Sequence, residues 1–188
     1  PYTVKNFIQR TITGVLFVAV IVGCILYNPL SFGILFAGIA ALAIREFATL
    51  VNKKEDIKVN KMTTMVGGSY LFFAIMGYCL NIYDSRIFIP YLMILMYIII
   101  RELYLKQSNP INNWAYSMMS QLYIALPFAL LNVLAFHTDI TQSSVQYNPI
   151  IPLAVFIFIW MSDSGAYCVG ITFGNCLLYT SDAADDLI

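Results

Sequence analysis

The chain has 188 residues and a formal net charge of zero; 60% of its residues are hydrophobic and only 11% are charged. Soluble domains carry a charge on about a quarter of their residues, so a water-soluble fold could not cover this much apolar side chain with so few polar groups. The composition therefore excludes an ordinary soluble domain and predicts a membrane protein.

Six hydrophobic segments follow one another along the chain, and each reaches or approaches the length of about 20 residues that a bilayer core requires. Lipid offers the backbone no hydrogen-bond partners, and no segment has the alternating pattern of a barrel strand, so each segment is predicted to be a helix. The fold class is therefore all-α, a polytopic membrane bundle with about six transmembrane helices. The segments run from about Ile12 to Tyr27, Leu30 to Leu50, Met62 to Ile82, Ile87 to Leu105, Ile111 to Phe136, and Pro149 to Gly170.

Two prolines give further local predictions. Asn28-Pro29 predicts a tight turn between the first two helices, and Pro127 predicts a kink in the fifth. The stretches 52–61 and 137–148 are polar and are predicted to be linkers at the membrane surface.

The basic residues predict how the chain lies in the membrane. With the N-terminus in the cytoplasm, nine of the ten basic residues fall on the cytoplasmic side and only Arg86 falls on the other. This bias follows the positive-inside rule, so we expect a multi-pass protein of the inner (cytoplasmic) membrane, with Asp163 at the cytoplasmic end of the sixth helix. The nine residues are Lys5, Arg10, Arg45, Lys53, Lys54, Lys58, Lys61, Arg101 and Lys106.

Asp163 is the principal candidate for a functional residue. It follows the apolar stretch 150–161 directly, and a charge placed on such a stretch marks a site by default. Its neighbours Ser162, Ser164 and Gly165 are small, which allows a metal ion or a phosphate to approach closely. Mg²⁺ prefers oxygen ligands and takes only one or two protein carboxylates. Asp163 alternatively caps a helix, together with the two serines.

Three stretches resemble a known family. Trp160–Tyr167, followed by Gly170 and Phe173-Gly174, resembles the (N/S)D(S/T)xAYxxGxxFG segment of the phosphatidate cytidylyltransferases, or CDP-diacylglycerol synthases. Gln9–Gly14 is similar to the Arg-x-x-Thr that leads into that family's first helix, and Arg45-Glu46-Phe47 is similar to the Glu-Phe pair that closes its second. The resemblance runs in order from about Lys5 to Gly174.

The resemblance implies a reaction and a set of site residues. The enzyme would transfer the cytidylyl group of CTP to phosphatidate, giving CDP-diacylglycerol and pyrophosphate for phospholipid biosynthesis, with Mg²⁺ as cofactor. Asp163 would be a catalytic metal ligand. The residues implied in substrate binding are Ser162, Ser164, Gly165, Tyr167, Gly170, Arg10 and Arg45.

Other interpretations stay open for these residues and for the chain. Arg10 and Arg45 could be anchors at the membrane surface, and Gly170 with Gly174 forms a GxxxG match that helix packing also explains. The alternative function is a polytopic transporter or structural membrane protein in which Asp163 alone binds an ion. Nothing indicates a nucleic-acid partner, and the partners expected are CTP, phosphatidate and membrane lipids; a homodimer stays open.

Residues 1–175 are predicted to form the transmembrane domain. The Lys-rich stretch, second metal-binding Asp and Pro-Gly-His-Gly-Gly stretch that follow in the family do not occur in this sequence, so we expect a fragment that is inactive alone. The stretch Cys176–Asp186 resembles the translation of a sequencing adapter, and residues 176–188 are therefore predicted to be a non-native tail.

Overall fold

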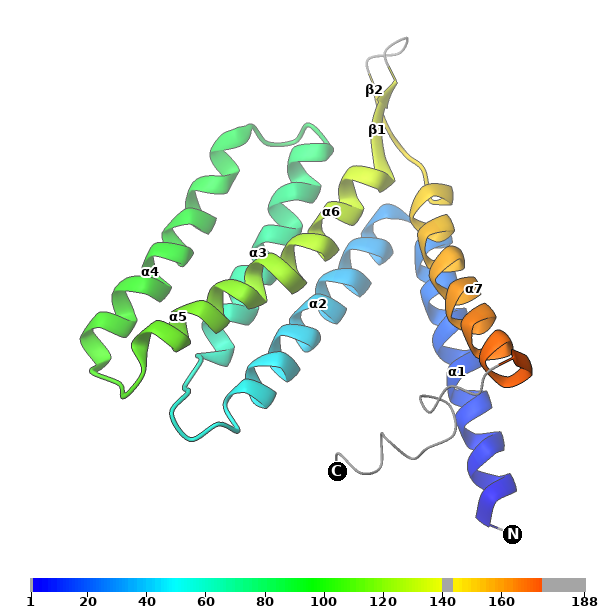
Figure 1. Cartoon of the computed structure of the whole chain (residues 1–188). Coiled ribbons are helices and arrows are strands. Elements are labelled where there is room, and N and C mark those ends of the chain that lie inside the picture. Colours follow the sequence, from blue (N-terminus) through cyan, green and yellow to red (C-terminus); the bar gives the residue numbers. More distant parts are fainter. Residues whose placement is uncertain (1, 140–143, 174–188) are drawn as a thin grey trace. The chain divides into compact units, whose positions relative to one another are not determined.

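The computed structural model describes residues 2–139 and 144–173, which are almost entirely helical (Figure 1). It divides into one part that ends at Pro149 and a second that begins at Ile150. The first part contains six α-helices and a β-hairpin, and the second contains helix α7. The helices are α1 (Tyr2–Tyr27), α2 (Pro29–Val51), α3 (Lys61–Cys79), α4 (Ile89–Leu105), α5 (Pro110–Met119), α6 (Leu126–Ala135) and α7 (Ile150–Phe173), and the strands are β1 (Phe136–Asp139) and β2 (Ser144–Tyr147).

The turn between α1 and α2 consists of one residue, as the Asn-Pro pair predicts. The Asn28 side chain accepts a hydrogen bond from the backbone N–H of Ser31 at 2.7 Å, and the Ser31 hydroxyl accepts one from the backbone N–H of Asn28 at 3.3 Å. Pro29 occupies the first turn of α2, where a backbone N–H has no helical partner to lose. This reciprocal cap stops one helix and starts the next.

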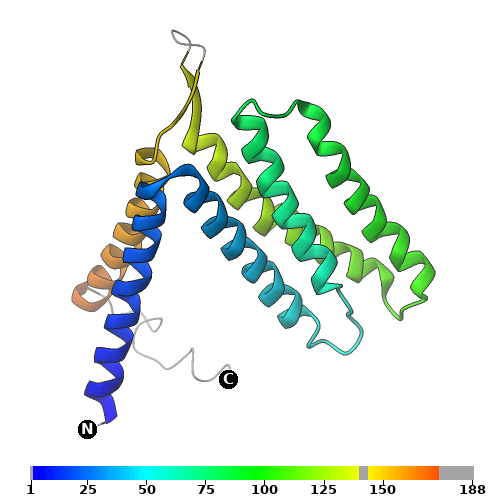
Figure 2. The ribbon, with the colours of Figure 1, turned by 180° about the vertical axis from the view of Figure 1, so that it is seen from behind.

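Helices α2, α3 and α6 form the core of the first part, and they lie side by side in views from both sides (Figures 1 and 2). A glycine makes the close approach of these helices feasible: a Cβ atom on Gly68 would meet the side chains of Ile44 and Ala125. Phe32 and Phe36 of α2 and Phe72 of α3 are also fully buried. Small residues at helix crossings let backbones approach, which is the usual means of packing in membranes.

The fifth hydrophobic segment is one long helix with an irregular middle. A π-helical turn, Ser120–Ala125, joins α5 to α6 and ends two positions before Pro127. Proline has no N–H and crowds the carbonyl of the preceding turn, and a widened turn accommodates this crowding. The sequence therefore placed the irregularity near the right residue, although the π-helical form was not predicted.

The linker 137–148 is not simply a polar loop, which corrects the sequence-based prediction. Strands β1 and β2 pair antiparallel, with Phe136 opposite Tyr147. Both rings contact Phe32, at centroid distances of 6.5 and 5.8 Å, and the Tyr147 hydroxyl donates a 2.6 Å hydrogen bond to the backbone oxygen of Ile25. These contacts with α1 and α2 hold the base of the hairpin, and they come from residues more than a hundred positions away in the sequence.

The exterior of the bundle is apolar, as a lipid-facing surface requires. Large side chains such as Leu16, Leu42 and Leu92 are more than half exposed on their helices. Among the described residues, four helical stretches are long and apolar enough to cross a membrane: Pro29–Val51, Lys61–Cys79, Ser85–Leu105 and Pro110–Ala135. The apolar stretches Ile12–Tyr27 and Ile150–Ala166 are shorter. The all-α fold is confirmed, and each of the six predicted segments coincides with a helical stretch.

Candidate functional site

Asp163 lies in the interior of α7. It lies thirteen positions after the first residue of the helix, Ile150, which corresponds to about 20 Å along the axis. The helix continues through Phe173, so Asp163 does not cap a helix N-terminus, and the capping interpretation is wrong. Its carboxylate is exposed, as are Ser162 and Ser164 on either side of it. An exposed carboxylate in an apolar helix therefore needs a reason other than capping.

The surroundings of Asp163 on α7 are small. Positions 163, 166, 167 and 170 follow the helical repeat, so Ala166, Gly170 and the backbone position of Tyr167 share a face with Asp163. Apart from the nearby backbone of α7 itself, no heavy atom of the described residues lies within 4 Å of where a Cβ of Gly165 would be. The neighbours of Asp163 at positions 166 and 170 of this face therefore have small side chains. Gly174, the second glycine of the GxxxG match, lies outside the described residues, so that match stays untested.

The two predicted arginines belong to the first part of the chain. Arg10 lies in α1, and Arg45 lies near the end of α2 with an exposed side chain. Arg10 lies 18 positions before the turn at Asn28 and Arg45 lies 17 positions after it, but α1 and α2 diverge from that turn in both views (Figures 1 and 2). The structure therefore does not bring Arg10 and Arg45 together, and the role of each in holding phosphate stays a prediction.

The residues around Asp163 fit a Mg²⁺ ion that is shared with a substrate. Within the described ranges, no group of three or more His, Cys, Asp and Glu side chains could hold a metal ion by itself. Mg²⁺ commonly takes one or two carboxylates and completes its shell with water and substrate phosphates. One exposed acid with small neighbours is a donor set of this kind, so the cation would be held together with a phosphate ligand rather than in a closed protein cage.

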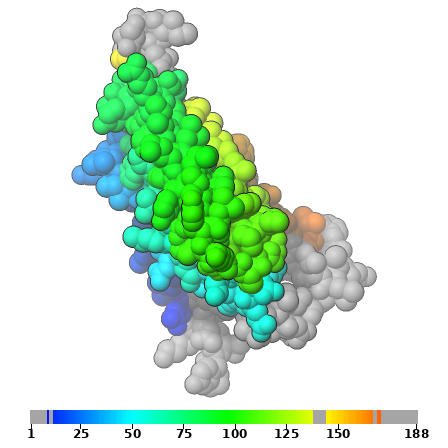
Figure 3. Space-filling view, turned by 90° about the vertical axis from the view of Figure 1, so that its left-hand side faces the viewer, coloured from blue at the N-terminus to red at the C-terminus, as the bar shows by residue number. Residues whose placement is uncertain are grey.

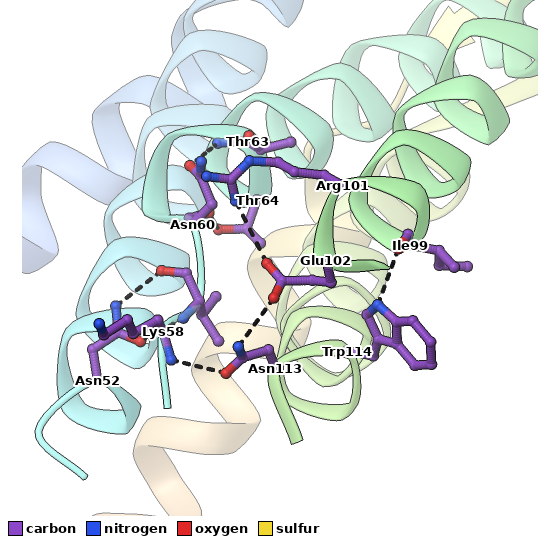
Figure 4. Close-up of polar contacts among 11 residues, drawn as sticks. Asn52, Lys58, Asn60, Thr63, Thr64, Ile99, Arg101, Glu102, Asn113 and Trp114 are labelled. Carbon is purple, nitrogen blue, oxygen red and sulfur yellow. Dashed lines mark hydrogen bonds and ion pairs between the residues drawn. The ribbon is translucent and has the colours of Figure 1, made fainter. Parts of the chain in front are cut away.

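A second polar cluster was not predicted from the sequence. Glu102 of α4 is only 4% exposed, and it and the adjacent Arg101 are the two charged residues of an otherwise largely apolar helix (Figure 4). Its Oε2 accepts a 3.0 Å hydrogen bond from Asn113 Nδ2, and its Oε1 lies 3.5 Å from Nη1 of Arg101. Asn113, which is fully buried, also accepts a 2.8 Å bond from the backbone N–H of Lys58. The cluster thereby joins α4, α5 and the linker before α3.

The signal for this cluster was present in the sequence. Glu102 is an acid inside a predicted transmembrane segment, so the rule that selected Asp163 applies to it equally. Glu102 lies inside the fourth predicted hydrophobic segment, but no role was predicted for it from the sequence. Beside the carboxylate is a cavity of about 10 Å³, enough for about one water molecule. Its polar lining consists of Asn60, Thr63, Thr64, Arg101, Glu102 and Ser117.

Two buried amides extend the polar interior further along the bundle. Gln121 donates to the backbone oxygen of Thr64 at 2.9 Å, and Asn132 donates to the backbone oxygen of Ala129 at 3.0 Å. Both donors thus hold helix backbones, while Gln121 Oε1 and Asn132 Oδ1 have no partner within the described part of the chain. Their position by the π-helical turn and α6 suggests a role in packing helices rather than in binding a substrate.

Comparison with known proteins identifies the family of the chain. No curated protein and no solved structure matches it. A family model described as the cytidylyltransferase family matches residues 8–180, which is most of the sequence and includes the Asp163 segment and both predicted arginines. The chain belongs to the cytidylyltransferase family.

Proposed function

We propose that the protein transfers the cytidylyl group of CTP to phosphatidate, forming CDP-diacylglycerol and pyrophosphate in phospholipid biosynthesis. Membership of the cytidylyltransferase family makes the protein a CTP-dependent nucleotidyltransferase. Four helical stretches among its described residues are long and apolar enough to cross a membrane. The observation that carries the finer proposal is the exposed carboxylate of Asp163 among small residues on the apolar helix α7. A lipid substrate suits a reaction site at this position, because Asp163 lies near the end of the apolar stretch Ile150–Ala166, where a lipid phosphate at the membrane surface could reach it.

The reaction needs charge compensation more than covalent help from the protein. An oxygen of the phosphatidate phosphate attacks the α-phosphorus of CTP, the bond from that phosphorus to the bridging oxygen breaks, and pyrophosphate leaves. Asp163 would hold Mg²⁺, which when bound supplies positive charge to the phosphates. The hydroxyls of Ser162 and Ser164 can donate hydrogen bonds to phosphate oxygens, and Gly165 leaves the backbone accessible to them.

Two further assignments belong to the proposal. Arg10 and Arg45 would contact lipid phosphate, because guanidinium groups bind phosphate through several donors. We also propose that the protein lies in the inner membrane with its N-terminus and Asp163 on the cytoplasmic side, where CTP is found. The bias of nine basic residues out of ten supports this orientation.

The proposal is tested by replacing Asp163 in the intact protein. Asp163→Asn keeps the size of the side chain and removes its charge, so CTP-dependent formation of CDP-diacylglycerol should fall by about 10–100-fold or more, the usual cost of damaging a metal site. Asp84→Asn is the matched control, because Asp84 is an exposed acid just before α4, at the end of the bundle away from Lys61 and Arg101. It should keep full activity.

Protein amount and helix content are compared between the two variants, so that lost activity is not confused with lost protein. A drop of less than about threefold in Asp163→Asn would be too small for a metal ligand and would contradict the assignment. A protein that forms no cytidylyl lipid at all, but whose cation transport depends on Asp163, would instead support the alternative function of a transporter.

A further inference from the structure

A groove runs between α3 and α4 on the outer face of the bundle. It measures about 420 Å³, and three residues from each helix line it with the same spacing. Figure 3 views the bundle from the side of α4, whose side chains occupy the front of that face. Both helices belong to stretches long and apolar enough to cross a membrane, so lipid tails would contact this face. The lining residues are Met62, Thr63, Val66, Met93, Ile94 and Tyr97.

An apolar groove does not select a ligand in a bilayer, because lipid tails are as apolar as the groove itself. Selection has to come from polar groups at one of its ends. Thr63 lines both the groove and the small polar cavity beside Glu102, so the two features adjoin at this residue. Arg101 lies one helical turn beyond Tyr97 on α4, and Lys61 is the first residue of α3. The groove therefore leads to two basic residues at one end of the bundle.

Glu102 holds the guanidinium group of Arg101, but most of the N–H donors of that group remain available for a ligand. Within the described residues, the ion pair of Arg101 is the 3.5 Å approach of Nη1 to Oε1 of Glu102, while Asn113 occupies the other oxygen of that carboxylate. A guanidinium group has five N–H donors, and the side chain of Arg101 is 29% exposed. Figure 4 shows its side chain extending from α4 toward Asn60 and Thr63. Donors therefore remain for a phosphate that approaches from the groove.

We propose that this groove and its basic end bind one anionic glycerophospholipid of the surrounding bilayer. An acyl chain lies along Val66 and Tyr97, and the phosphate contacts Arg101 and Lys61. Glu102 acts as a positioning residue, because it fixes the guanidinium from the interior while a lipid phosphate meets it from outside. This site takes its ligand from the bulk lipid, and it stands whether or not the proposed reaction is correct.

The test measures which lipid contacts the groove. Trp114 and Trp160, the two tryptophans of the chain, are replaced by phenylalanine in the intact protein, and Tyr97→Trp introduces one reporter into the groove. Leu42→Trp provides a reporter for comparison, since Leu42 lies at a similar distance from its helix end on α2 and is 58% exposed. Each protein is reconstituted in bilayers in which either phosphatidylglycerol or phosphatidylcholine carries brominated chains that quench tryptophan fluorescence.

We expect brominated phosphatidylglycerol to compete about fivefold better than phosphatidylcholine for the position at residue 97, the effect of about one basic residue at an anionic surface. The reporter at residue 42 should show no preference. Arg101→Gln should abolish the preference at residue 97, and Lys61→Gln should reduce it. Lys106→Gln, which removes an exposed charge just after α4, should leave it unchanged.

Arg101→Gln leaves Glu102 buried without a cation, so the double variant Arg101→Gln with Glu102→Gln is measured as well; it removes both charges and leaves no unpaired buried ion. Loss of preference in the folded double variant supports the site. Equal quenching by the two lipids in the unaltered groove overturns the proposal, and so does a preference that survives in the double variant.

Discussion

Asp163 and Glu102 are both carboxylates within apolar helices, but their surroundings are opposite. Asp163 is exposed among small residues, where it can accept a ligand. Glu102 is buried, and both of its oxygens have protein partners. Burial of a charge is tolerated only when it is paired and hydrogen-bonded. At the scale of residues, Asp163 is suited to chemistry, and Glu102 is suited to holding Arg101 and three chain segments in place.

The first prediction concerns Asn113, which bridges Glu102 and the backbone of Lys58. Asn113→Ala leaves a buried carboxylate with one partner fewer and a backbone N–H with none. The free energy of unfolding should therefore fall by about 2–3 kcal/mol. Thermal unfolding in detergent measures this, and Asn112→Ala is the matched control because Asn112 is exposed. Equal stability of the two variants would contradict a role of the cluster in holding these segments.

At the scale of elements, the close packing of α2 against α3 depends on Gly68. A Cβ at this position would meet Ile44 on α2 and Ala125 at the end of the π-helical turn. Gly68→Ala should lower the free energy of unfolding by about 1–3 kcal/mol, the usual cost of overpacking. Gly38→Ala, at a position on α2 with no atom within 4 Å of the new Cβ, should be neutral or raise stability by up to about 1 kcal/mol. Unfolding of both variants in detergent gives the comparison, and a neutral Gly68→Ala would mean that the helices do not cross at this glycine.

Tyr147 connects the β-hairpin to α1. Its hydroxyl donates to the backbone oxygen of Ile25, and burial raises the pKa of Tyr147 to about 12. Tyr147→Phe should lower the unfolding temperature at pH 7, because it removes one hydrogen bond worth about 1 kcal/mol. The raised pKa means that the folded protein keeps the phenol proton more firmly than the unfolded chain. The stabilisation is therefore complete below pH 10 and is lost as the pH rises toward 12.

Thermal unfolding of the native protein and of Tyr147→Phe at pH 8 and pH 11 tests both parts of this prediction. The difference in unfolding temperature between the two proteins should be smaller at pH 11. A difference that is the same at both pH values would show that the phenol does not titrate in this way.

Much of the helix pattern could be predicted from local sequence, because each break has its own chemistry. Three helices begin at the polar breaks between the predicted hydrophobic segments. They are α2 after Asn28, α3 after Asn60 and α5 at Pro110. The hairpin was missed because its base is held by Phe32 and Ile25, which are distant in sequence. The burial of Glu102 was missed for the same reason, since Asn113 reaches it from another helix.

At the scale of the whole molecule, α2, α3, α4 and the continuous helix of α5 and α6 alternate in direction, so the linker 52–60 and the β-hairpin lie at opposite ends of this part (Figures 1 and 2). The proposed orientation predicts that the linker is cytoplasmic and the hairpin external. In a protein without its native cysteines, Gln146→Cys should react with a membrane-impermeant maleimide in intact cells, and Asp56→Cys should react only after the membrane is opened. Both positions are exposed. Labelling of position 56, but not of position 146, in intact cells would contradict the proposed orientation and support the reverse one.

The central claim is that the protein moves the cytidylyl group of CTP onto phosphatidate, and the fate of each phosphorus of CTP tests it directly. The intact protein in membranes is supplied with phosphatidate and with CTP labelled at either the α- or the γ-phosphorus. The account predicts that the α-label enters the lipid fraction and that the γ-label leaves as pyrophosphate. Entry of the γ-label into lipid, or no phosphatidate-dependent transfer of either label, would contradict it.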